Sequence, residues 1–338
     1  MHTPIADFVR AYASSDTLRL HMPGHKGAEF LGLEKLDITE IRGADSLYEA
    51  EGIIARSERN ASILFGCPTY YSTEGSSQCI RAMLHLAAQS ARQQGRKPHV
   101  AAARNVHKTF LSAVALLDPE VTWLYPKHQN SYLSCVITAS ELDALFRAAE
   151  NPPTAVYVTS PDYLGNVADI GALAQVCHTY GALLLVDNAH GAYLRFLPES
   201  GHPMDLGADL CCDSAHKTLP VLTGGAYLHI GKNAPAAFAE NAKAAMALFG
   251  STSHSYLTLL SLDRCNRYLS EGYCASLEET AQRLEKLRRC AIGAGRCWAA
   301  TRFASLLPRR MAFPAAILPR GCAGAMWSVN LRIGTFWC

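Results

Sequence analysis

The feature that most constrains the fold is an uninterrupted apolar run, Ala-Leu-Leu-Leu-Val at residues 182–186, which ends in Asp187. A strand of continuous apolar character needs cover on both faces, as in a parallel sheet enclosed between two layers of helices. Other short apolar runs alternate with segments of helical periodicity, and they lie at residues 99–103, 121–124, 155–158, 210–212 and 226–230. This alternation between about residues 60 and 230 predicts an α/β domain with a mostly parallel central sheet.

Helical spacing of apolar residues predicts helices at residues 78–94, 170–180 and 277–290. Ser76 or Ser77 is expected to cap the first of them, because serine oxygens accept from the free N–H groups of a helix start. Thr138 and Glu141 form a capping-box pattern, which predicts a fourth helix from there to about residue 150.

The composition indicates a globular chain without a membrane segment. Its 338 residues are 49% hydrophobic, enough for one large domain and part of another. Apolar runs stay well below the roughly 18 residues of a membrane helix, and the first 20 residues lack a signal-peptide pattern. Twelve cysteines occur without a C-x-x-C pair, and apolar neighbours around Cys177, Cys211 and Cys212 indicate reduced core thiols. We therefore expect a cytoplasmic protein with no metal site.

The charge is unevenly distributed along the chain. The last 48 residues contain six Arg but no Asp, Glu or Lys, so residues 1–290 carry 25 basic and 29 acidic side chains. These first 290 residues show no basic stripe of the kind that nucleic-acid binding needs, and no nucleic-acid partner is expected.

Polar residues follow four of the expected strands directly. His107 comes after the strand at 99–103, Asp162 after 155–158, Asp187 and His190 after 182–186, and Lys217 after 210–212. Ligands of open α/β sheets bind beyond the carboxyl ends of the strands. The sequence therefore predicts a site at this edge of the sheet.

Lys217 and Asp187 together point to pyridoxal phosphate (PLP). Lys217 lies in Ser-Ala-His-Lys-Thr at residues 214–218, shortly before Thr-Gly-Gly at 223–225. A partly desolvated lysine can attack the PLP aldehyde to form an imine, and a buried carboxylate such as Asp187 can keep the pyridine nitrogen protonated. Alternatively, Lys217 is a solvated surface charge and Asp187 caps the turn after its strand.

Other residues are candidates for holding the cofactor. Gly75, Ser76 and Ser77 precede a helix whose free N–H groups suit a phosphate, although serine-rich helix caps are common and no Walker motif follows. Ser214 and His216 are further phosphate donors. His107 either stacks on the ring or is an ordinary loop histidine. His190 either supports Asp187 and lines the pocket or is likewise an ordinary loop residue.

Taken together, these motifs resemble the ornithine/lysine/arginine decarboxylase family. Motifs that resemble family segments lie at residues 21–26, 37–41, 45–48, 72–78, 104–108, 159–165, 214–217 and 250–256. The resemblance covers roughly residues 3–290 and the short form of the family, without an N-terminal receiver-like wing domain. Asp162 and Leu164 depart from it, because a threonine and a tyrosine are expected there.

The resemblance implies the three-layer, aspartate-aminotransferase-like fold of type I PLP enzymes and a homodimer with shared active sites. It implies that His107 stacks on the pyridine ring and that Ser76, Ser77, Ser214 and His216 hold the phosphate. Thr252 or a neighbouring hydroxyl would reach the phosphate of the partner subunit. The implied domains are an N-terminal arm at 1–55, a large PLP-binding domain at 56–265 and a truncated or aberrant C-terminal domain at 266–338. The acid-free composition after about residue 290 suggests out-of-frame translation, against the alternative of a short, basic natural tail.

The expected function is PLP-dependent decarboxylation of arginine, lysine or ornithine to the amine and CO2, a step of polyamine metabolism. Alternatives are another type I reaction, such as transamination or elimination, or a truncated PLP-binding protein without turnover. Glu74 and Asp162 are candidates for recognising a cationic substrate side chain, with structural roles as the alternative.

Overall fold

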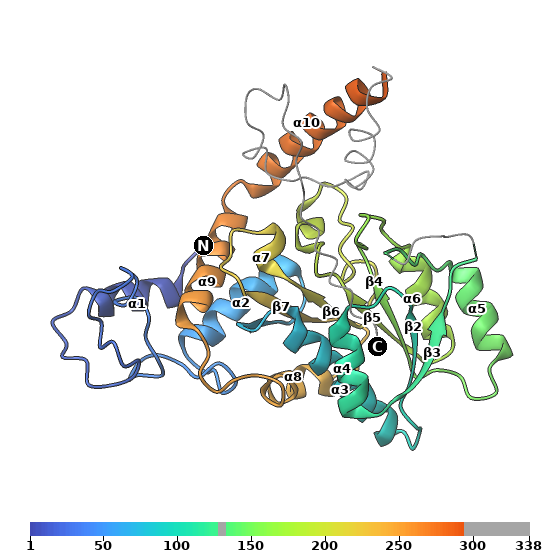
Figure 1. Cartoon of the computed structure of the whole chain (residues 1–338), viewed down its shortest axis with the longest axis horizontal. Coiled ribbons are helices and arrows are strands. Elements are labelled where there is room, and N and C mark those ends of the chain that lie inside the picture. The colour runs from blue at the N-terminus through green and yellow to red at the C-terminus, as the bar shows by residue number, and fades with distance from the viewer. Residues whose placement is uncertain (128–132, 294–338) are drawn as a thin grey trace.

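The computed structural model describes residues 1–127 and 133–293, and a seven-stranded sheet lies at the centre of this part of the chain (Figure 1). The strand order is β1-β7-β6-β5-β4-β2-β3. Only β7 runs antiparallel to its neighbours in this sheet, so the sheet is mostly parallel, as the sequence predicts. The strands are β1 (Thr69–Ser72), β2 (His99–Ala103), β3 (Glu120–Leu124), β4 (Ala155–Thr159), β5 (Leu183–Asp187), β6 (Leu210–Asp213) and β7 (Ala226–Ile230).

Helices surround the sheet, with α3, α4 and α8 gathered on one side of it (Figure 1). The helix α10 extends away from the sheet as a long arm. The helices are α1 (Pro4–Ala13), α2 (Ile53–Phe65), α3 (Ser76–Gln93), α4 (Lys108–Leu117), α5 (Ala139–Ala148), α6 (Ile170–Thr179), the 3₁₀ helix η1 (Ala192–Phe196), α7 (Ala215–Thr218), α8 (Ala237–Ala247), α9 (Tyr256–Ser270) and α10 (Tyr273–Gly293).

The strand β5 is buried between two hydrophobic clusters. Leu184 and Val186 belong to a cluster that contains buried residues of α2, α6 and α9. Leu185 belongs to the other cluster, which contains buried residues of α3, α4 and α8. Because successive strand residues face opposite sides of a sheet, β5 needs apolar residues at every position. The three-layer α/β fold predicted from this run is confirmed.

Local details bear out most of the sequence signals and correct one. Thr138 and Glu141 form the predicted capping box of α5. Cys177, Cys211 and Cys212 are free, buried thiols. The prediction that Ser76 or Ser77 caps α3 is wrong, because Gly75 occupies the N-cap position with φ 73° and ψ 179°. Both serines lie within the first turn, where their backbone N–H groups have no side-chain cap.

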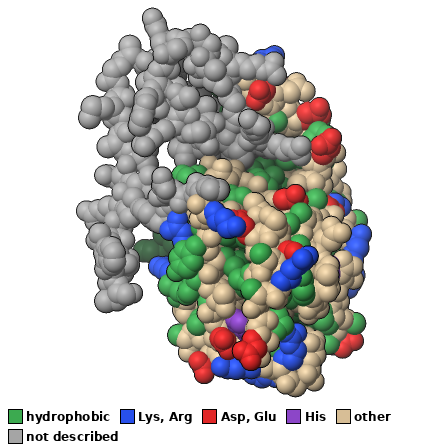
Figure 2. All heavy atoms as spheres, turned by 90° about the vertical axis from the view of Figure 1, so that its right-hand side faces the viewer, with side chains coloured by type: hydrophobic (Ala, Val, Ile, Leu, Met, Phe, Trp, Pro, Cys, Tyr) green, Lys and Arg blue, Asp and Glu red, His purple; other side chains and the backbone are tan. Residues whose placement is uncertain are grey.

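Some predictions concern residues that the structure does not describe. The acid-free tail lies almost entirely beyond residue 293, so neither its proposed origin nor a small C-terminal domain is described, and the three domain boundaries stay predictions. Within the described ranges, no helix has the length and apolar character to cross a membrane. On the face of the molecule shown in Figure 2, Lys and Arg side chains are interspersed with Asp and Glu side chains.

Candidate functional site

A cavity of about 160 Å³ lies at the carboxyl ends of the central strands. It contains nine of the ten cofactor-binding candidates from the sequence, because β2, β4, β5 and β6 all end at this edge. The lining residues are Gly75, Ser76, Ser77, His107, Thr159, Tyr163, Asp187, Ala189, His190, Ser214, His216 and Lys217. Thr252, the tenth candidate, is exposed and lies outside this cavity, so its predicted role in the site of a partner subunit is untested.

Asp187 is the buried carboxylate of the cavity, with 2% of its surface exposed. Its Oδ2 accepts a hydrogen bond from the Tyr157 hydroxyl at 3.2 Å, and its Oδ1 accepts from the Ala189 backbone N–H at 3.2 Å. Burial, followed by the Asp187 charge, raises the pKa of Tyr157 far above its usual range, so that hydroxyl keeps its proton. In the part of the chain that the structure describes, Asp187 forms no salt bridge. A buried carboxylate without a cationic partner suits a ligand that carries a protonated nitrogen.

Lys217 is exposed, and its Nζ lies 3.1 Å from His190 Nε2. Desolvation by the surrounding protein lowers the pKa of Lys217 from its ordinary value, and the Asp187 carboxylate opposes this shift. Burial, and next the Lys217 charge, also lower the pKa of His190. Both shifts favour the neutral forms, and a neutral amine is the form that attacks an aldehyde.

The start of α3 lines the cavity next to the turn that carries Lys217. A Cβ added at Gly75 would have His216 Cε1 and Ser77 N as its nearest neighbours, each at 4.0 Å, so glycine leaves open space there. The Ser214 hydroxyl donates to Ser76 Oγ at 2.8 Å, which joins this turn to the one that carries Lys217. Free backbone N–H groups, serine hydroxyls and the positive end of the helix dipole suit a phosphate group.

Two histidines flank the space between these groups. His107 is the N-cap of α4, and its Nδ1 accepts from the Thr109 backbone N–H, which fixes the orientation of the ring. Burial lowers the pKa of His107 despite the nearby Asp187 charge. His216 donates from Nδ1 to the Gly225 carbonyl at 3.0 Å. The ring of His216 can therefore donate a second hydrogen bond, to an anion, only as an imidazolium.

The sequence predicts a site at this edge but does not assign four of its residues to it, namely Tyr157, Thr159, Tyr163 and Ala189. Thr159 and Tyr163 line the cavity, and Thr159 Oγ1 is buried without a hydrogen-bond partner among the described residues. Tyr157 supports Asp187 from β4. All four lie in or shortly after the last residues of the expected strands at 155–158 and 182–186, and that position is the available signal. The unpartnered hydroxyl, the uncompensated Asp187 carboxylate and the open start of α3 together fit PLP.

The two acidic candidates for substrate recognition are engaged elsewhere. Asp162 is buried, and its Oδ1 accepts from the backbone N–H groups of Leu164 at 2.8 Å and Asn166 at 2.9 Å. Glu74 is exposed and accepts from the Ser251 N–H. These contacts favour the structural alternative for Asp162, because its carboxylate holds its own loop together.

The chain is similar in sequence to an arginine decarboxylase of Halalkalibacterium halodurans, with 30% identity over 302 residues. The alignment covers 83% of this chain, and the chain spans 59% of that relative. The fold is similar to that of the Francisella novicida lysine decarboxylase LdcF, with a TM-score of 0.73, 17% identity and coverage of 88% of this chain and 45% of that one. It is also similar to a structure of Oryza sativa TDC with PLP, with a TM-score of 0.53, 18% identity and coverage of 71% and 66%.

The model of the family described as Orn/Lys/Arg decarboxylase, major domain, matches residues 3–311. This match extends over most of the chain and agrees with the motifs noted in the sequence. The protein therefore belongs to the Orn/Lys/Arg decarboxylase family and has the fold of type I PLP-dependent enzymes.

Proposed function

We propose that this chain is the cofactor-binding part of a PLP-dependent decarboxylase of a basic amino acid. The observation that carries the proposal is the convergence of Lys217, Asp187 and His107 on one cavity that also contains the open start of α3. Family membership implies PLP as the cofactor. The arginine decarboxylase relative and the lysine decarboxylase fold neighbour support a basic amino acid as the substrate class.

Each residue would have a distinct task. When bound, PLP would supply an electron sink for the loss of the substrate carboxylate as CO2. Lys217 would hold the cofactor covalently through Nζ, and Asp187 would keep the pyridine nitrogen protonated. His107 would pack against the ring face. Its fixed orientation as the cap of α4 suits that task, because a mobile ring would first have to be ordered.

The remaining cavity residues would hold the phosphate. Ser76, Ser77 and Ser214 would donate hydroxyl hydrogen bonds, Gly75 would leave room for the anion beside the backbone N–H groups, and His216 would donate as an imidazolium. His190, with Nε2 3.1 Å from Lys217 Nζ, would line the pocket and accept a hydrogen bond from that amine.

We further propose that the enzyme is a cytoplasmic homodimer in which Thr252 reaches the phosphate of the partner subunit. Thr252 is exposed and outside its own cavity, as a residue that serves a second subunit should be. The arm at residues 1–55, the large domain at 56–265 and the C-terminal part from 266 onward are the proposed domains.

The function is tested by cofactor trapping followed by product analysis. The purified protein should show the visible absorbance of lysine-bound PLP, and borohydride should fix the cofactor on Lys217. Lys217→Ala should abolish both signals, and Lys97→Ala, at an exposed lysine paired with Glu120, should leave them unchanged. A wild-type protein that binds no PLP after reconstitution would refute the proposal.

Product analysis separates the possible reactions. Carboxyl-labelled arginine, lysine or ornithine should release labelled CO2 without formation of a keto acid. A keto acid would indicate transamination on the same scaffold, and bound PLP without turnover of any of the three would indicate a PLP-binding protein. Either result would overturn the decarboxylase assignment and leave the PLP site in place.

A further inference from the structure

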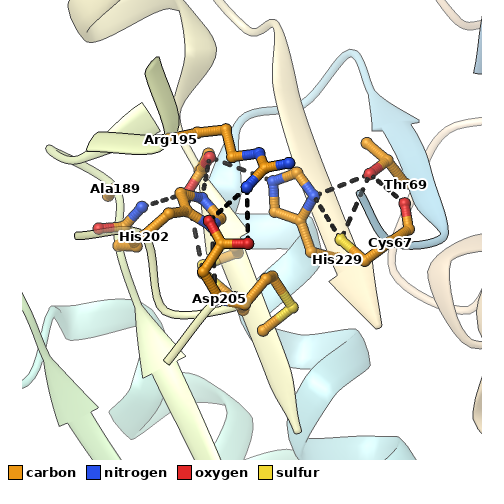
Figure 3. Close-up of polar contacts among 12 residues, drawn as sticks. Cys67, Thr69, Ala189, Arg195, His202, Asp205 and His229 are labelled. Carbon is orange, nitrogen blue, oxygen red and sulfur yellow. Dashed lines mark hydrogen bonds and ion pairs between the residues drawn. The ribbon is translucent and has the colours of Figure 1, made fainter. Parts of the chain in front are cut away.

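A buried polar cluster lies behind the cavity, around Asp213 at the end of β6. The Asp213 side chain is fully buried. Its Oδ2 accepts from His202 Nε2 at 3.0 Å and His229 Nε2 at 3.1 Å, and its Oδ1 accepts from Asn188 Nδ2 at 2.6 Å. Figure 3 shows His202 and His229 in this cluster, with Arg195 and Asp205 beside them.

The cluster lies on the face of the sheet opposite to Asp187. Cys212 is paired with Asp187, whereas Cys211 is paired with His229. Side chains alternate between the two faces along a strand, so Asp213 shares the face of Cys211 and His229, and Asp187 shares the face of Cys212. The carboxylates of Asp213 and Asp187 therefore reach the cavity edge from opposite sides.

The donors to Asp213 come from segments that are far apart in the sequence. Asn188 immediately follows Asp187, His202 lies between η1 and β6, and His229 belongs to β7. His229 also bonds Thr69 Oγ1 through Nδ1 at 2.9 Å, which extends the cluster to β1 (Figure 3). One carboxylate thus connects the turn after β5 with the turn after β6, in which Ser214 and Lys217 lie.

The electrostatics of the cluster make this connection strong. Burial tends to raise the pKa of Asp213, but the adjacent imidazoles of His202 and His229 outweigh it and hold that pKa well below its usual range. The carboxylate is therefore ionised, and hydrogen bonds to an ionised acceptor are stronger than neutral ones. An ionised group fixed in this way resists displacement, because any movement would leave a buried charge with fewer donors.

Three residues of this region, His202, Cys211 and Asp213, are of types that bind metal ions. Ligand atoms of His202, Cys211 and Asp213 lie within 4.8 Å of one another. However, His202 already uses both ring nitrogens, since Nδ1 accepts from the Met204 N–H at 3.4 Å and Nε2 contacts Asp213. A metal would have to displace these hydrogen bonds, so the geometry favours a hydrogen-bonded cluster.

We propose that Asp213, held by His202 and His229, is a positioning residue that fixes the Ser214–Lys217 turn relative to Asp187. This inference rests on the proposed function, because it assigns a task toward PLP. It predicts that the cofactor site is assembled from both faces of the sheet. Asp213 itself does not line the cavity and touches no reacting atom.

The test compares Asp213→Asn with a matched variant at the other end of β6. Asp209 is also a buried aspartate, with 1% of its surface exposed, and it accepts from His178 Nε2 at 3.0 Å and the Leu184 N–H at 2.7 Å. It immediately precedes β6, far from the cavity edge. We expect Asp213→Asn to raise the dissociation constant of PLP about tenfold or more and to shift the visible absorbance of the bound cofactor. Asp209→Asn should lower the unfolding midpoint and leave both readouts unchanged.

Asn188→Ala provides a second measurement if Asp213→Asn does not fold. It removes the hydrogen bond between Asp213 and the Asp187 turn and leaves both histidine contacts in place, and it should weaken PLP binding in the same direction. If the folded variants have wild-type dissociation constants and spectra, the positioning role of Asp213 is overturned, whereas the proposed function is not affected. One equivalent of zinc in the purified protein, lost in His202→Gln, would overturn that role in favour of a metal site. A wild-type protein that binds no PLP would overturn the proposed function as well.

Discussion

Gly75→Ala tests the phosphate part of the cavity most directly. Gly75 has φ 73° and ψ 179°, a conformation that is almost restricted to glycine. This conformation turns the chain from β1 into α3 and leaves the first backbone N–H groups of the helix without a side-chain cap. Alanine therefore has to adopt a strained backbone or reshape the turn that is proposed to hold the phosphate.

The structure limits the size of the effect. The nearest atoms to an added Cβ lie 4.0 Å away, so the substitution meets no steric clash within the protein. The cost is then the backbone conformation alone, about 1–3 kcal/mol. If the turn keeps its shape, the free energy of unfolding of the apoprotein should fall by this amount. If the turn relaxes, the loss should appear in PLP affinity, as a dissociation constant roughly 5- to 150-fold higher.

The assay combines urea unfolding of the apoprotein with PLP titration followed by fluorescence. Gly181→Ala is the control, because Gly181 has φ +66°, open space around it and no place in the cavity lining. It should destabilise the apoprotein by about 1–2 kcal/mol and leave PLP affinity unchanged. A Gly75→Ala protein with wild-type stability and wild-type PLP affinity would refute the reasoning.

Three other predictions concern neighbouring parts of the molecule. Tyr157→Phe removes a hydroxyl that donates to the Asp187 carboxylate, and we expect a loss of about 1.5–3 kcal/mol in PLP binding, measured by titration. Trapping of PLP by borohydride should increase with pH around a midpoint below the 10.4 or so of free lysine, because the pKa of Lys217 is lowered. Asp187→Asn should move that midpoint further down, since the carboxylate favours the ammonium form; an upward shift would contradict the assignment. Thr138→Ala should cost about 1 kcal/mol of stability in thermal or urea unfolding, with PLP affinity unchanged.

Much of the sheet can be predicted because strands that are buried on both faces consist of continuous apolar runs. Apolar residues fill β5 up to Asp187, so its position and its burial on both faces follow from the sequence. The strand β1, with Thr-Tyr-Tyr-Ser, gave no such signal. Its pairing with β7 depends on contacts such as Thr69 with His229, which lie 160 residues apart. Local patterns carry no information about partners at that distance.

The start of α3 shows how residues can line the predicted cavity although their local structure is predicted wrongly. Serine is a favoured N-cap residue, so Ser76 and Ser77 were the natural choices. The helix instead begins after Gly75, which reaches a backbone conformation that serine rarely adopts. The serine hydroxyls are thereby placed beside the cavity rather than on the helix backbone, and Ser76 accepts from Ser214 instead.

The position of the Lys217 amine depends on tertiary contacts more than on its own motif. Its helix α7 has only four residues, too few to be stable alone. The His216 backbone N–H donates to the Gly225 carbonyl at 3.1 Å, and the preceding residue pair, Asp213 with Tyr227, ends the pairing of β6 with β7. The motif supplies the lysine, but the pairing of β6 with β7 decides where that lysine lies. Substitutions in the Asp213 cluster, at the carboxyl end of β6, are therefore expected to alter the cofactor site without touching the cavity lining.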